Sequence, residues 1–140
     1  MSVKFTWNGD EVKKRAEEAS KLSSYEVGLV VQGQAKMLTP VDKGRLRSSI
    51  TTASGAGQRT KPSGEGAVST DIINKPDNQF ETFVGTPVFY GPYVEYGTVK
   101  SDAQPFLRPA LDIIRGRKLT VVDEVLKNGK IRKAFGEYLQ

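Results

Sequence analysis

The sequence predicts an α+β fold, in which a small antiparallel β-sheet of about three to four strands packs against a long N-terminal helix and a long C-terminal helix. Two observations predict it. Apolar residues recur at helical spacing towards both ends of the chain, and short segments of alternating polarity separated by turn sequences lie between them. Strands joined by short or flexible links favour antiparallel pairing. At 140 residues, we expect a single domain over 1–140.

The N-terminal helix is expected over about residues 9–38. Asn8 and Glu11 have the spacing of an N-cap followed by an acidic residue in the first turn. A second capping pattern at residues 23–26 leaves open whether the helix continues or restarts there. Pro40 ends it, because proline disfavours the α conformation in the residue before it.

Three strands are expected in the middle of the chain. Alternating polarity predicts them over residues 46–52, 68–72 and 80–84, the first of them after a turn at residues 41–44. Residues 54–66 hold five glycine or proline residues and no large apolar side chain. They therefore predict a long mobile loop.

The segment from Val84 to Thr98 is rich in aromatic residues and poor in charge, since Glu95 is its one charged side chain. Pro92 suits the first turn of a helix and Gly97 its C-terminal end, which predicts a single helical turn. Aromatic side chains with so little charge around them are costly to leave in water. They must pack on their own domain or on a partner.

The C-terminal helix is expected to begin near Phe106 and to extend to about Leu126. Pro109 then lies in the first turn, where its missing N–H would have had no partner. The apolar stripe of this helix is Leu107, Leu111, Ile114, Val121 and Val125. The turn at residues 128–129 ends it, and a short last helix is expected over residues 130–139.

The residue types present argue against an enzyme. The chain has no histidine and no cysteine, which removes the commonest general base, the thiol nucleophile and the commonest metal ligands. The glycine pairs of the 54–66 loop lack the order of a phosphate-binding loop. We expect no catalytic, cofactor-binding or metal-binding residues and no cofactor. The carboxylates without metal-site spacing, which we expect to be surface charges, are Asp71, Asp77, Glu81 and Glu95.

The chain carries a net charge of +5, concentrated near its C-terminus. This pattern predicts either a solvated helix face or contact with an acidic partner such as DNA. Because the aromatic residues do not alternate with the basic ones, any DNA contact is expected to be with the backbone and non-specific. The candidates for a DNA conduit or an acidic partner are Arg59, Lys61, Arg115, Arg117 and Lys118. No apolar run approaches the roughly 20 residues of a membrane span, so no membrane contact is expected.

Two motifs carry a resemblance. Leu38-Thr-Pro-Val-Asp-Lys-Gly-Arg-Leu-Arg-Ser-Ser-Ile50 resembles the (A/T)PVDTGRLRxSI segment of tail-component, or head–tail joining (neck), proteins of long-tailed bacteriophages and prophages. Residues 84–98 and Pro105-Phe-Leu-Arg-Pro-Ala-Leu111 look like the VGT…YAxYVEfGT…aqPFLRPAl run of the same family. Order and spacing agree from about residue 10 to residue 126. Lys43 stands where the family usually has threonine, and the 54–66 loop is longer than in many members.

The resemblance implies a non-enzymatic virion structural protein at the head–tail junction, made in the host cytoplasm. It implies a neck or tail-completion component that forms a ring or contacts rings, with itself and other neck and tail proteins as partners. A tail-terminator or tail-tube-associated role is an alternative, and a basic DNA-binding protein is an alternative from another class. The interface candidates are Asp42, Arg45, Phe89, Tyr90, Tyr93, Tyr96 and Arg108.

Each interface candidate also has a local interpretation, which the sequence leaves open. Asp42 and Arg45 either pair with each other in the turn around Gly44 or contact a neighbouring subunit. The four aromatic side chains either pack in the core or form an interface. Arg108 either caps a helix or partners Glu95.

Overall fold

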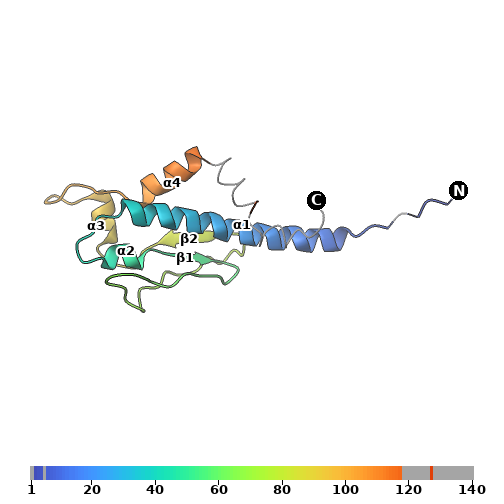
Figure 1. Ribbon diagram of the computed structural model, residues 1–140, viewed down its shortest axis with the longest axis horizontal. Coiled ribbons are helices and arrows are strands. Elements are labelled where there is room, and N and C mark those ends of the chain that lie inside the picture. The colour runs from blue at the N-terminus through green and yellow to red at the C-terminus, as the bar shows by residue number, and fades with distance from the viewer. Residues whose placement is uncertain (1, 5, 118–126, 128–140) are drawn as a thin grey trace.

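The computed structural model describes residues 2–4, 6–117 and 127 (Figure 1). The architecture is α+β, with a long N-terminal helix, a two-stranded antiparallel sheet and a C-terminal helix. In chain order the elements are α1 (Gly9–Leu38), α2 (Arg45–Ser49), β1 (Thr51–Ser54), β2 (Thr82–Gly85), α3 (Gly91–Tyr96) and α4 (Leu107–Gly116).

Helix α1 is a single uninterrupted helix of 30 residues, which confirms the predicted bounds. At 1.5 Å per residue it is about 45 Å long. It does not restart at residues 23–26, because the Ser23 hydroxyl donates to the Ala19 carbonyl at 2.8 Å within the helix instead of capping a new one. At its C-terminal end, the Thr39 backbone N–H and hydroxyl both donate to the Ala35 carbonyl, at 3.0 and 2.6 Å.

The sheet has fewer strands than expected. Strand β1 pairs with β2 in antiparallel register, with Thr51 opposite Gly85 and Ser54 opposite Thr82. The prediction of one strand over 46–52 was wrong in its first half, which is helix α2. Leu46 and Ile50 are four residues apart, so they share one face of a helix as well as one face of a strand. A segment of five residues is too short to distinguish the helical period of 3.6 residues from the strand period of two.

The strand predicted over 68–72 is absent from the described part of the chain. Local turns replace it, since the Asp71 N–H donates to the Val68 carbonyl at 3.0 Å and the Ile72 N–H to the Thr70 carbonyl at 2.9 Å. The strand predicted over 80–84 is present as β2, which begins two residues later than predicted. The loop over 54–66 folds back along β1, where the Thr60 N–H donates to the Thr52 carbonyl at 2.8 Å.

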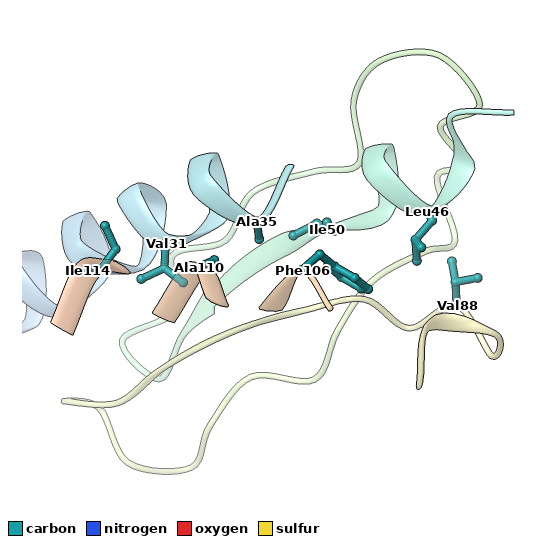
Figure 2. Close-up of a cluster of buried hydrophobic side chains, with 8 residues drawn as sticks. All are labelled: Val31, Ala35, Leu46, Ile50, Val88, Phe106, Ala110 and Ile114. Atoms are coloured by element: carbon teal, nitrogen blue, oxygen red, sulfur yellow. The ribbon is translucent and has the colours of Figure 1, made fainter. Parts of the chain in front are cut away.

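The hydrophobic core lies between α1 and the segment that ends in α4. Figure 2 shows its buried side chains facing one another from four parts of the chain. Phe106 and Ile50 are fully buried at its centre. The complete cluster is Val31, Ala35, Leu46, Ile50, Val88, Phe106, Ala110 and Ile114.

A buried polar network joins α1 to the sheet. The Gln32 amide donates to the Ile50 carbonyl at 2.9 Å, and its oxygen accepts from the Thr52 hydroxyl at 2.9 Å. The helix approaches the strands most closely at Gly28, where a Cβ would lie 2.6 Å from the Thr82 methyl group and 2.9 Å from that of Thr52. Glycine at this position therefore lets α1 lie close against the sheet.

Helices α3 and α4 begin near their predicted positions. Helix α3 is a short helix that begins at the buried Gly91 and is followed by Gly97, whose φ of +77° is favoured in glycine. Helix α4 begins at Leu107, so that Pro109 lies in its first turn. The predicted continuation of this helix to about residue 126 and the short helix over 130–139 lie outside the described residues.

Candidate functional site

The two sequence motifs meet around one hollow of about 510 Å³. The turn before α2 forms one wall, and the segment leading into α3 forms the other. Asp42, Arg45 and Tyr90, three of the interface candidates, line this hollow together. The remaining lining residues are Pro40, Val41, Lys43, Gly44, Leu46 and Val94.

Arg45 pairs with Asp71, which lies 26 residues further along the chain. Its Nε and Nη2 donate to the two carboxylate oxygens of Asp71, both at 3.4 Å. The hydrogen bond to Asp71, followed by the charge of that carboxylate, raises the pKa of Arg45. Asp42 lies exposed on the turn. The expectation that Asp71 is a surface charge was wrong, because its exposed fraction is 6% and it holds the motif arginine in place.

Glu95 was also expected at the surface and is instead buried, with an exposed fraction of 8%. It lies on α3, and its carboxylate accepts three backbone N–H groups from the start of α4. Oε2 accepts from Phe106 at 2.8 Å and Leu107 at 3.0 Å, and Oε1 accepts from Arg108 at 2.9 Å. The first N–H groups of a helix have no partner within the helix, so Glu95 caps α4 from another element.

Two opposing effects act on the Glu95 carboxyl. Burial raises its pKa, whereas the hydrogen bonds from Phe106, Leu107 and Arg108 and the charge of Arg108 lower it, and the net shift is downward. The charged form is therefore the stable one at this position. The signal for this cap in the sequence is indirect. Glu95 and the residues that begin α4 lie in the same motif.

The aromatic candidates divide into one inner and three outer side chains. Tyr90 is half-buried and packs against the core, with its ring edge-to-face to Phe89 at a centroid distance of 5.4 Å. Phe89, Tyr93 and Tyr96 have exposed fractions of 80%, 59% and 68%. Arg108 donates its backbone N–H to Glu95, and its guanidinium lies 5.5 Å from the centroid of the Tyr96 ring.

A second and larger hollow is a groove of about 990 Å³ between α1, β2, α3 and α4. One side is formed by residues of α1 from Ser23 to Val31, and the other by Leu107, Leu111 and their neighbours on α4. Along the groove runs β2, which contributes Thr82, Phe83 and Val84. Tyr96 and Arg108 also line it.

The basic candidates do not form one surface. Arg59 and Lys61 lie exposed on the loop after β1, and Arg115 and Arg117 lie exposed at the end of α4. Figure 1 places these segments on opposite sides of α1 and the sheet. Lys118 lies outside the described residues.

Within the described part of the chain, no three acidic, histidine or cysteine side chains gather where they could hold a metal ion. None of the described helices combines the length and the apolar character needed to cross a membrane.

Comparison with known proteins identifies the family. The family model described as "Bacteriophage HK97-gp10, putative tail-component" matches residues 4–97, about two thirds of the chain. No curated protein and no solved structure gives a match. The matched range includes the elements from α1 to α3 and ends before the second half of the second motif, at which α4 begins. The chain therefore belongs to the HK97-gp10 family of bacteriophage tail-component proteins.

Proposed function

We propose that this phage structural protein is a neck or tail-completion component at the head–tail junction, and that it acts through protein–protein assembly. The observation that carries the proposal is the row of exposed aromatic side chains at α3. Its partners are further copies of itself, in a ring or against rings, and other neck and tail proteins. This assignment agrees with its membership of a tail-component family.

Phe89, Tyr93 and Tyr96 are held outward by neighbours that are fixed in the interior. Val88 precedes the three rings, Glu95 lies between the last two of them, and both are buried, so the backbone that carries the rings is anchored at these two points. Rigid aromatic side chains lose little conformational entropy on binding and are frequent at the centres of interfaces. Because these rings contribute little to the core, a protein partner is the best explanation of their exposure.

The runner-up is a tail-terminator or tail-tube-associated role, and the two differ in the partner to which the protein binds first. A free DNA-binding role has less support, because the basic candidates lie on opposite sides of the molecule. Non-specific contact with packaged DNA at either side is compatible with the neck assignment.

The test is a phage strain that lacks the gene, complemented with variants. We expect the deletion to leave packaged heads and separate tails, and the double variant Phe89→Ala/Tyr93→Ala to do the same while the protein stays folded. Truncation of two interface aromatics of this kind costs about 2 kcal/mol or more each. Lys75→Ala, at an exposed loop position, is the matched control and should restore normal particles.

Two outcomes would contradict the proposal. Normal infectious particles from the deletion strain would exclude a role in joining. If the labelled protein co-purifies with tails made in the absence of heads, the tail-terminator or tail-tube role is correct instead.

A further inference from the structure

Strand β2 has an open backbone edge, and this edge lies in the large groove. The Gly55 N–H donates to the Glu81 carbonyl at 3.0 Å, which fixes the alternation of hydrogen-bonded pairs along the β1–β2 ladder. By that alternation, Thr82 and Val84 direct their backbone N–H and C=O groups away from β1. Among the described residues, no backbone group pairs with this outer edge. The outer edge of β1, by contrast, is covered by the loop residues Arg59 and Thr60.

The groove offers an extended segment both hydrogen-bonding groups and apolar contacts. Phe83 and Leu111 line it and have exposed fractions of 48% and 40%. An exposed strand edge beside apolar side chains is the usual acceptor for an added strand, since the backbone supplies affinity and the alternate side chains supply specificity.

The chain carries a segment with the pattern of such a strand at its N-terminus. Residues 2–8, here called the arm, precede α1 and read Ser-Val-Lys-Phe-Thr-Trp-Asn. Apolar Val3, Phe5 and Trp7 alternate with polar Lys4 and Thr6, which is the period of a half-buried strand. Val3 is 91% exposed and Trp7 is 79% exposed, although the Trp7 ring lies against Gly9. Figure 1 shows the described residues of the arm beyond the N-terminal end of α1, away from the sheet.

The arm cannot reach the groove of its own molecule. The α1 residues that line the groove begin at Ser23, about 21 Å along the helix from Gly9. The seven residues of the arm span about 23 Å when fully extended. Folded back along α1, the arm would only touch the near end of the groove and could not lie along Thr82–Thr86.

We propose that the arm of one copy adds as a strand to the outer edge of β2 in a second copy. Residues 2–8 then supply backbone hydrogen bonds to Thr82 and Val84, and their apolar side chains fill the groove between α1 and α4, on the face of β2 opposite to the Phe83 side chain. Donor and acceptor are different surfaces, so the contact is head-to-tail and generates a ring or an open chain of copies. The inference rests on the proposed function, because it gives the self-association in that function a structural basis.

The fluorescence of Trp7 gives the first test. Trp7 is the one tryptophan of the chain, so the emission of the protein reports on the arm alone. As the concentration of the full-length protein rises, we expect the emission maximum to move to shorter wavelength together with the increase in mass measured by light scattering. Deletion of residues 2–8 should weaken association by at least about tenfold while leaving the circular dichroism of the folded domain unchanged.

Cross-linking gives the second test, and the absence of native cysteine makes it specific. A chain with Thr6→Cys is mixed with a chain of different mass that carries Phe83→Cys, and the mixture is oxidised. We expect a mixed disulfide dimer, because cross-strand neighbours lie within disulfide range. Replacing Phe83→Cys by Ala67→Cys, an exposed position outside the groove, is the matched control and should give at least tenfold less mixed dimer.

Three outcomes would overturn the proposal. They are a protein that stays monomeric at every concentration, association that is unchanged without the arm, and a mixed dimer no more abundant than the Ala67→Cys control. If truncation after Arg117 increases the labelling of Phe83→Cys and the arm has no effect, the groove belongs instead to the C-terminal residues of the same chain. Arm-independent association with normal head–tail joining would overturn this inference and leave the proposed function intact.

Discussion

The carboxylate of Glu95 binds the backbone N–H of Phe106 at 2.8 Å, and this contact ties the end of α3 to the start of α4. Replacing Glu95 by alanine leaves three backbone N–H groups, that of buried Phe106 among them, without their acceptor. We expect Glu95→Ala to lower the free energy of unfolding by about 1–3 kcal/mol, measured by urea denaturation. Glu18→Ala, on the exposed surface of α1, should change it by less than about 0.5 kcal/mol. An equal loss in both variants would show that the cap contributes nothing.

The same contact makes part of the stability depend on pH. The pKa of Glu95 is lowered in the folded chain, so its stabilising effect is complete above the ordinary glutamate pKa of about 4.3 and is lost as the pH falls through the lowered value. The difference in unfolding free energy between the parent and Glu95→Gln should therefore shrink below about pH 4. Denaturation at a series of pH values measures it. A difference that grows towards acid pH would mean that the sign of the shift is wrong.

Phe106 and Phe89 should separate stability from assembly. Phe106 is fully buried in the core, and Phe89 is 80% exposed. Phe106→Ala is expected to lower the free energy of unfolding by about 3–5 kcal/mol. Phe89→Ala should change it by less than about 0.5 kcal/mol and should reduce the yield of joined particles. Thermal unfolding and particle counts by electron microscopy provide the two measurements. Substantial destabilisation by Phe89→Ala would show that its ring belongs to the core.

The backbone conformation at position 44 requires glycine. Its φ is +71°, and an added Cβ would lie 2.6 Å from the carbonyl oxygen of Glu65. We expect Gly44→Ala to destabilise the fold by at least about 1 kcal/mol. Gly33→Ala is the matched control, because beyond its chain neighbours and the backbone of its own helix no described atom lies within 4 Å of its added Cβ, and it occupies a helix interior. That variant should be stabilised by about 0.5–1 kcal/mol, and both are measured by thermal unfolding.

The helices could be predicted from the sequence because their signals are local and long. Thirty residues of helical period in α1 leave little room for another structure, and Pro92 and Pro109 mark helix starts through their fixed φ. The helix over residues 45–49 could not be predicted in the same way, because the spacing of Leu46 and Ile50 fits both a helix and a strand. In the structure, the hydroxyls of Ser48 and Ser49 donate to the backbone carbonyls three residues earlier, as in a helical turn.

The buried carboxylates could not be found in the sequence, because their partners lie elsewhere in the chain. Asp71 meets Arg45 across 26 positions, and Glu95 meets backbone groups that no side-chain pattern reveals. The open edge of β2 is hidden for a similar reason. In the predicted meander the strand over 68–72 pairs with the strand over 80–84, whereas in the structure β1 pairs with β2 directly, so which edge of β2 is open follows only from the structure.

The core joins side chains of α1 to side chains of α4, which lie far apart in the sequence, and this affects how the protein folds. Val31 and Ile114 belong to the same cluster although they lie 83 positions apart in the sequence. Contacts so distant in sequence form slowly, because a long loop must close first. Until α4 has been synthesised, the part of the apolar face of α1 that packs against α4 has no cover. The apolar core of the nascent protein therefore closes only after residues 107–116 have been synthesised.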